Sequence, residues 1–66
     1  MTPGTAFLRG QLAYAQGKPC ILKHDPVMVS ALCDLDNRQF SELHQRFIAG
    51  WNEAKEIATE MRAPAH

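Results

Sequence analysis

The chain has little of several things that mark common classes of function. Its 66 residues carry seven basic and seven acidic side chains, so the net charge is zero when the histidines are neutral. A neutral chain has no long-range field to steer it onto nucleic acid or an anionic membrane. It also has no apolar run long enough to span a bilayer and no basic-then-apolar signal segment at its start. We therefore expect a cytoplasmic protein that does not enter a membrane.

Cysteine is scarce, and both cysteines are expected to be free thiols. Without a secretory signal, Cys20 and Cys33 should meet the reducing cytosol. Cys20 and His24 are spaced like one pair of zinc ligands, but Cys33 and His44 lack the tight spacing of a second pair. Cys33 lies in an apolar stripe, which predicts a small core residue. We expect neither a metal site nor a cofactor.

Motifs for catalysis are lacking as well. The four glycines are too far apart to form a phosphate-binding loop. Catalysis by a cysteine and a histidine would also need a substrate pocket. A chain this short can hardly enclose the several hundred Å³ that ligand pockets usually occupy. We therefore expect no enzymatic activity and no small-molecule substrate.

Two short helices are predicted in the first half of the chain. A Thr-Pro pair starts the first one and Gly17 ends it, which predicts a helix over 3–16. Asp25 is followed by a proline, and that pair predicts a short helix over 26–33 inside the connector 17–36.

A long amphipathic helix is predicted over 37–62, followed by a frayed tail at 63–66. Its apolar residues recur at helical spacing: Phe40, Leu43, Phe47, Gly50, Trp51, Ala54, Ile57, Ala58 and Met61. A glycine inside a helix costs about 1 kcal/mol relative to alanine. We infer that another backbone approaches Gly50 closely, and that it belongs to the first helix near Gly10. Trp51 would then fill the core, with Tyr14 packed on the long helix.

These elements predict an all-α fold, namely a helical hairpin made of a short helix, a connector with a short helical turn and a long C-terminal helix. The first helix is about half as long as the apolar stripe on the long one, so it cannot cover the whole stripe. Residues 20–33 or a second copy of the chain must cover the rest. We expect a homodimer, because twofold pairing is the commonest arrangement of oligomers.

Two segments resemble the ribosome modulation factor family. The first carries Ala6, Arg9, Gly10, Ala13 and Gly17 at that family's spacing, and the second carries Gly50-Trp51-x-Glu53-Ala54 after Phe47. The resemblance implies two helices that carry these motifs in this order. It also implies a protein that binds the small ribosomal subunit during dormancy. Related short proteins are common in phages and other bacterial mobile elements.

The ribosome hypothesis assigns phosphate contacts to the basic side chains of the first half, Arg9, Lys18 and Lys23. That half holds three basic groups against one acidic group, whereas the second half holds four against six. The alternative for these three residues is ordinary surface charge, because no aromatic residues interleave with them as RNA-reading platforms.

A second hypothesis is a phage- or mobile-element-type adaptor or inhibitor that binds a host protein. Its mechanism would be docking of an apolar groove or helix face, with acidic residues at the rim. Glu53, Glu56 and Glu60 share one face of the predicted long helix and could form that rim, although a solvated face is the simpler reading. Under either hypothesis, the residues expected to pack the helices or contact a partner are Gly10, Gly17, Phe40, Leu43, Phe47, Gly50, Trp51 and Ala54.

Overall fold

A computed structural model describes residues 1–62 of the chain. It contains helix α1 (Pro3–Ala15), the 3-10 turn η1 (Leu22–His24), helix α2 (Pro26–Leu32) and helix α3 (Asn37–Arg62), and this part of the chain has no strand. The all-α class is as predicted. The first two helices end one residue before the predicted 16 and 33, and the third has the predicted bounds. Residues 63–66, predicted to be a frayed tail, lie outside the described part.

Polar caps explain where the helices begin and end. Thr2, Asp25 and Asp36 each precede a helix, and each side chain accepts a hydrogen bond from a backbone N–H in the following turn. Gly17 follows the end of α1 with φ of 75°, in the left-handed region that glycine adopts without a steric penalty. The local sequence therefore sets the helix boundaries.

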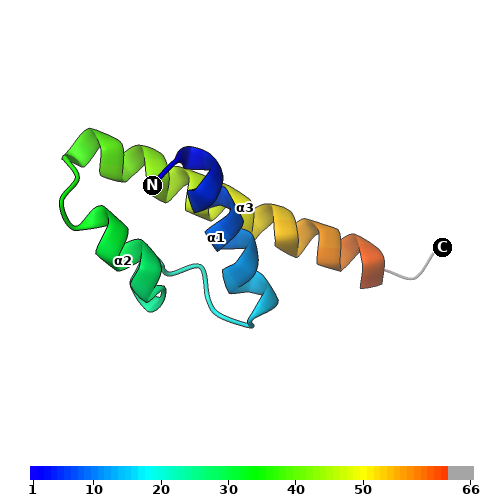
Figure 1. The fold of residues 1–66 in the computed structure, drawn as a ribbon. Coiled ribbons are helices and arrows are strands. Elements are labelled where there is room, and N and C mark those ends of the chain that lie inside the picture. The colour runs from blue at the N-terminus through cyan, green and yellow to red at the C-terminus, as the bar shows by residue number, and fades with distance from the viewer. Residues whose placement is uncertain (63–66) are drawn as a thin grey trace.

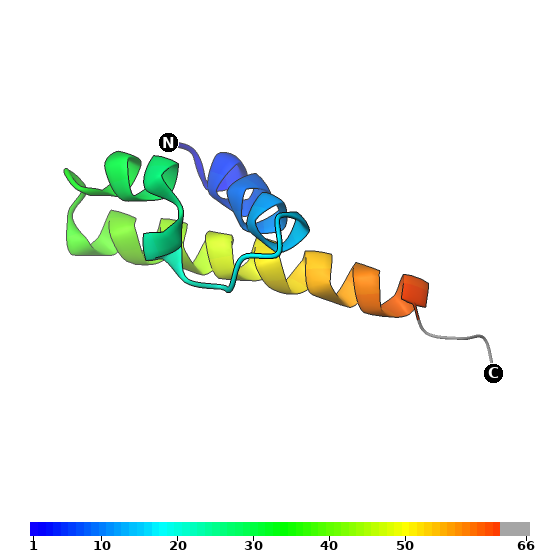
Figure 2. The ribbon, with the colours of Figure 1, turned by 90° about the horizontal axis from the view of Figure 1, so that it is seen from below.

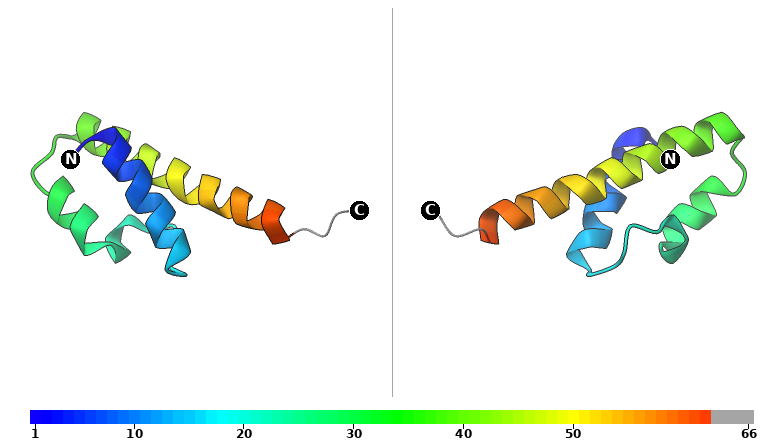
Figure 3. Two further views of the ribbon diagram at one scale, coloured as in Figure 1. Left: turned by 45° about the vertical axis from the view of Figure 1, so that its right-hand side comes forward. Right: turned by 180° about the vertical axis from the view of Figure 1, so that it is seen from behind.

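α1 and α3 cross, and they run in the same general direction (Figures 1 and 2). From the end of α1, η1 and α2 lead the chain back to the start of α3. They lie beside the first half of α3. The two helices of the predicted hairpin therefore form a crossed, roughly parallel pair joined by a helical connector. The second half of α3 extends past the other helices, as both views in Figure 3 show, and the molecule measures 48 × 18 × 14 Å.

The core lies where α1 and the connector meet the first half of α3. Its buried apolar side chains are Ala6, Ala13, Leu22, Met28, Leu32, Leu43 and Phe47. Phe47 and Met28 are the largest fully buried ones. Cys20, Leu35 and Trp51 pack against this cluster while partly exposed.

The apolar stripe of α3 is covered only in its middle. Phe40, near the helix start, is exposed and packs edge-on against His44 instead of entering the core. Beyond Trp51 the other helices end, and Ile57 and Met61 are 46% and 82% exposed. Despite this exposed apolar surface, none of the helices in residues 1–62 has the length and apolar character needed to cross a membrane.

Gly10 and Gly50 form the crossing point of α1 and α3. A Cβ built on Gly10 would lie 2.0 Å from the carbonyl oxygen of Phe47, and one built on Gly50 would lie 2.0 Å from that of Phe7. Each glycine thus faces the backbone of the other helix, which no side chain could permit. The close approach expected at Gly50 is present, and it involves the glycine expected in the first helix.

We predict that Gly10→Ala and Gly50→Ala each destabilise the fold, even though alanine is the better helix former. The new methyl group must push two backbones apart, and such overpacking costs about 1–3 kcal/mol. In a domain of this size, each kcal/mol lowers the melting temperature by roughly 4–8 °C. Thermal unfolding followed by circular dichroism measures the change.

Gly4→Ala is the matched control, because a Cβ at Gly4 would meet only the Thr2 hydroxyl oxygen at 4.0 Å. We expect this variant to melt at or above the wild-type temperature. A Gly50→Ala variant as stable as Gly4→Ala would show that the two backbones do not need this close approach.

Candidate functional site

Arg9 and Asp25 form a two-pronged ion pair between α1 and the start of α2. The Arg9 Nε and one terminal nitrogen each donate to a different carboxylate oxygen of Asp25, both at 2.9 Å. The Asp25 side chain is almost fully buried, whereas that of Arg9 is 26% exposed. Paired geometry of this kind is the strong form of a charged hydrogen bond. Arg9, predicted to contact phosphate, is therefore engaged in holding the connector to α1.

Asp25 also caps α2, so its carboxylate accepts hydrogen bonds from the backbone as well as from Arg9. The backbone N–H groups of Val27 and Met28 donate to it at 3.0 and 3.3 Å. Burial acts to raise the pKa of Asp25. The hydrogen bond from Arg9 and the two backbone N–H groups outweigh burial, and they hold the pKa below its ordinary value. The carboxylate therefore stays ionised at neutral pH.

Trp51 joins the end of α1 to the middle of α3. Its indole Nε1 donates to the carbonyl oxygen of Lys18 at 3.0 Å. The rings of Tyr14 and Trp51 meet edge to face, with centroids 5.3 Å apart and planes at 84°. The Lys55 Nζ lies 5.5 Å from the centroid of the Trp51 ring, within cation–π range. Trp51 is thus half-buried at the side of the core instead of filling it.

A shallow hollow opens beside this aromatic pair. Its lining residues are Tyr14, Ala15, Gly17, Lys18, Pro19 and Trp51. Lys18 is half-buried here, and Lys55 reaches the same indole ring from one turn further along α3. Two aromatic rings and Lys18 thus line the hollow, and Lys55 lies over the same indole without belonging to the lining.

The other two predicted phosphate contacts have different surroundings from Arg9. Lys18 lines the hollow, whereas Lys23 is exposed on η1. Lys55 was not among the predicted site residues. Its position four residues after Trp51 on a helix is the sequence signal that could have identified it, because residues at that spacing are neighbours on the helix surface.

The structure places six of the eight predicted packing residues at the helix crossing and the other two outside it. Gly10, Leu43, Phe47 and Gly50 are buried at the crossing, while Trp51 and Ala54 are half-buried at its edge. Gly17 forms the turn that ends α1, and Phe40 lies exposed outside the core.

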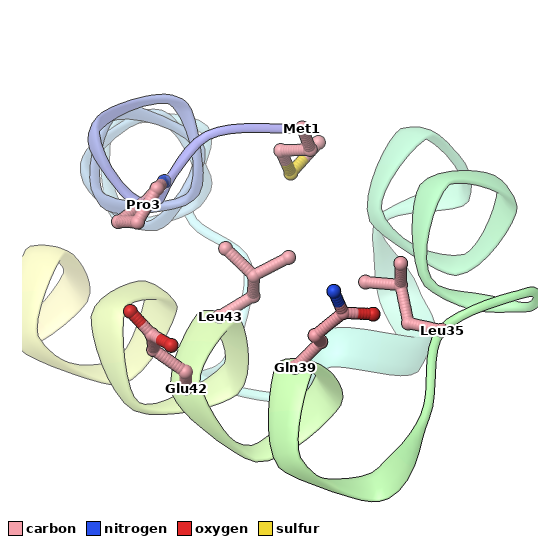
Figure 4. A pocket seen from close by; sticks show the side chains of 6 residues that line it. All are labelled: Met1, Pro3, Leu35, Gln39, Glu42 and Leu43. Atoms are coloured by element: carbon pink, nitrogen blue, oxygen red, sulfur yellow. The ribbon is translucent and has the colours of Figure 1, made fainter.

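A second hollow lies between the start of the chain and the start of α3. It is open to solvent, has a volume of about 220 Å³, and is lined by Met1, Pro3, Leu35, Gln39, Glu42 and Leu43 (Figure 4). Glu42 is the one side chain in this lining that can ionise. A lone carboxylate without a partner acid, base or nucleophile gives no basis for catalysis.

The cysteines do not lie where the sequence placed them. The prediction that Cys33 is a core residue is wrong: it is exposed just after α2, and its thiol donates to the Ser30 carbonyl oxygen at 3.2 Å. Cys20 is half-buried, and that burial raises the pKa of its thiol. Both thiols are free. Within residues 1–62, no three histidine, cysteine or acidic side chains come together to hold a metal ion.

We predict that the two partners of the ion pair differ in importance. Arg9→Met leaves a buried carboxylate without its cation, which costs about 3 kcal/mol. Asp25→Asn keeps a helix-capping residue and strands only the more exposed Arg9, so it should cost less. Urea unfolding of both variants measures the difference, and an equal loss would contradict this account.

The contribution of Asp25 should also depend on pH. Because its pKa is lowered in the folded state, the stability it adds is fully present above the ordinary aspartate pKa of about 3.9. That stability is lost as the pH falls through the lower pKa of the folded state. The stability difference between wild type and Asp25→Asn should therefore shrink below about pH 4.

Comparisons of the chain with protein-family models, with curated proteins and with solved structures find no match. The resemblance to ribosome modulation factors therefore rests on the motif residues. In three dimensions those residues converge: Gly10 and Gly50 make the helix crossing, Arg9 holds the connector, and Gly17 and Trp51 shape the hollow.

Proposed function

We propose that the chain is a small non-catalytic binding protein that associates with the ribosome. The observation that carries this proposal is the convergence of both motif segments at one helix crossing, which brings Lys18 and Lys55 to the Tyr14–Trp51 pair. Lysines beside aromatic side chains are typical of surfaces that bind RNA. The resemblance to ribosome modulation factors supplies the ribosome as the source of that RNA.

In this proposal the attraction to RNA comes from a few local lysines and not from the net charge of the chain. Lys18, Lys23 and Lys55 would contact phosphates, whereas Arg9 is held by Asp25. Three phosphate contacts release few counterions, so the affinity should fall only about 20- to 40-fold between 50 and 200 mM salt. Strongly basic RNA-binding proteins lose far more over the same range.

We predict that the chain co-sediments with ribosomal particles from a bacterial lysate at low salt, and less so at moderate salt. Lys18→Glu combined with Lys23→Glu should abolish co-sedimentation, because each change replaces a phosphate-binding cation with a repelling charge. A sucrose gradient at each salt concentration, followed by detection of a tag, measures the bound fraction.

Arg38→Glu combined with Arg46→Glu is the matched control. Both arginines are exposed on the first half of α3, and the pair makes the same change in net charge. This control should still co-sediment. Migration of the wild type away from ribosomes at both salt concentrations would refute the proposal, as would an equal loss in the two double variants.

The exposed end of α3 favours a second candidate function, an adaptor or inhibitor that binds a host protein. Ile57 and Met61 are exposed one turn apart on the segment that no other helix covers. Glu53, Glu56 and Glu60 are exposed on the same segment. An apolar strip with acidic neighbours suits a groove that is apolar inside and basic at its edge.

For this second function we predict that Ile57→Gln combined with Met61→Gln removes a captured partner without unfolding the chain, since both side chains already face solvent. Leu8→Gln combined with Val29→Gln removes comparable exposed apolar surface on α1 and α2 and should keep the partner. A quantitative pull-down compares them. Sedimentation velocity of the purified chain determines whether a second copy of the chain occupies the same strip. If the variant with both α3 changes still captures the partner, the strip is rejected as the contact.

A further inference from the structure

The hollow beside Trp51 has the composition of a site for one nucleotide of single-stranded RNA. We propose that a base stacks on the Trp51 indole, beside Tyr14, while its phosphate contacts the ammonium groups of Lys18 and Lys55; this inference rests on the proposed association with the ribosome. The hollow has a volume of about 520 Å³ and is open to solvent.

The indole ring is held in place before any ligand arrives. Its Nε1 is bonded to the Lys18 carbonyl oxygen at 3.0 Å, and Tyr14 meets it edge to face. A ring fixed in this way loses little freedom when a base stacks on it. Such stacking is sequence-tolerant, because every base presents a flat π-face.

Lys55 shows which side of the indole a base can reach. It is an exposed residue, and its Nζ lies over the Trp51 ring at 5.5 Å from the centroid. This ring face is therefore covered by a flexible, exposed side chain. A base that stacks there displaces the ammonium group from the ring, and the lysine stem is long enough to turn that group toward the phosphate of the same nucleotide.

The charges around the hollow favour an anion. Among the residues that line it, Lys18 is the one charged side chain and none is a carboxylate. Glu56 and Glu60 line a different hollow on α3, together with Lys55. Gly17 adds no side chain at the rim, where a Cβ would meet no atom within 4 Å. A phosphate inside the hollow therefore meets no carboxylate in its lining.

The test uses Trp51 itself, because it is the single tryptophan of the chain and its fluorescence reports on this site alone. The purified full chain is titrated with an oligoadenylate of about ten nucleotides at low salt. We expect saturable quenching that weakens as salt is added. Inorganic phosphate alone should leave the emission unchanged, since it brings no base to the ring.

Variants separate the site from a general charge effect. Lys55→Glu should weaken the oligoadenylate affinity about tenfold, because a repelling charge replaces a phosphate contact. Arg46→Glu makes the same change in net charge outside the hollow and should bind within about twofold of wild type. Tyr14→Phe, which keeps the ring, should bind normally, whereas Tyr14→Leu should bind more weakly while circular dichroism shows the fold intact.

The possible results also distinguish this site from the proposed ribosome association. Co-sedimentation with ribosomes but no quenching would overturn the stacking site and leave the association standing. Quenching without co-sedimentation would support the nucleotide site and refute the ribosome as the source of the bound RNA. Quenching by inorganic phosphate, or equal weakening by Lys55→Glu and Arg46→Glu, would overturn the stacking proposal.

Discussion

The structure depends on one contact between two backbones, at the crossing of α1 and α3. Gly10 lies against the carbonyl of Phe47, and Gly50 lies against the carbonyl of Phe7, at distances that exclude any side chain. This approach lets the short helix bury Ala6 and Ala13 directly against α3. It also brings the end of α1 beside α3, where the Lys18 carbonyl oxygen accepts a hydrogen bond from the indole of Trp51. The core and the candidate RNA-binding hollow follow from the same crossing.

A second constraint holds the connector, whose apolar side chains Leu22, Met28 and Leu32 lie in the core. Asp25 follows η1, caps α2 and binds Arg9 of α1, so one buried carboxylate fixes three parts of the chain. A small domain buries too little apolar surface to rely on packing alone. A buried ion pair adds little net stability compared with apolar packing, but it strongly disfavours arrangements in which the charge is left unpaired. Arg9 and Asp25 therefore specify where the connector lies more than they strengthen the fold.

Caps, prolines and a terminal glycine made the helices predictable from the sequence. The glycine crossing was predictable because a glycine inside a helix destabilises it, and a close approach of another backbone explains why a glycine is needed there. The pairing of Arg9 with Asp25 was not predictable, because it joins residues far apart in the chain and the sequence shows only two opposite charges.

The position of Cys33 was predicted wrongly for a related reason. Its stripe on α2 is short, and the helix ends before that position reaches the core. Lys55 was missed because its meaning depends on how Trp51 is oriented, which only the packing of α1 determines.

The position of Trp51 explains how a neutral chain could still bind RNA. Net charge governs long-range attraction, but contacts at a few ångströms depend on which groups line one surface. Arg9 is neutralised by Asp25, while Lys18 and Lys55 lie beside a half-buried indole with no carboxylate in the lining of the hollow. The same tryptophan also ties the end of α1 to α3, so replacing it would change the fold and the site together. Its lysine neighbours can change without disturbing the crossing, and for that reason they are the residues that can separate a role in architecture from a role in binding.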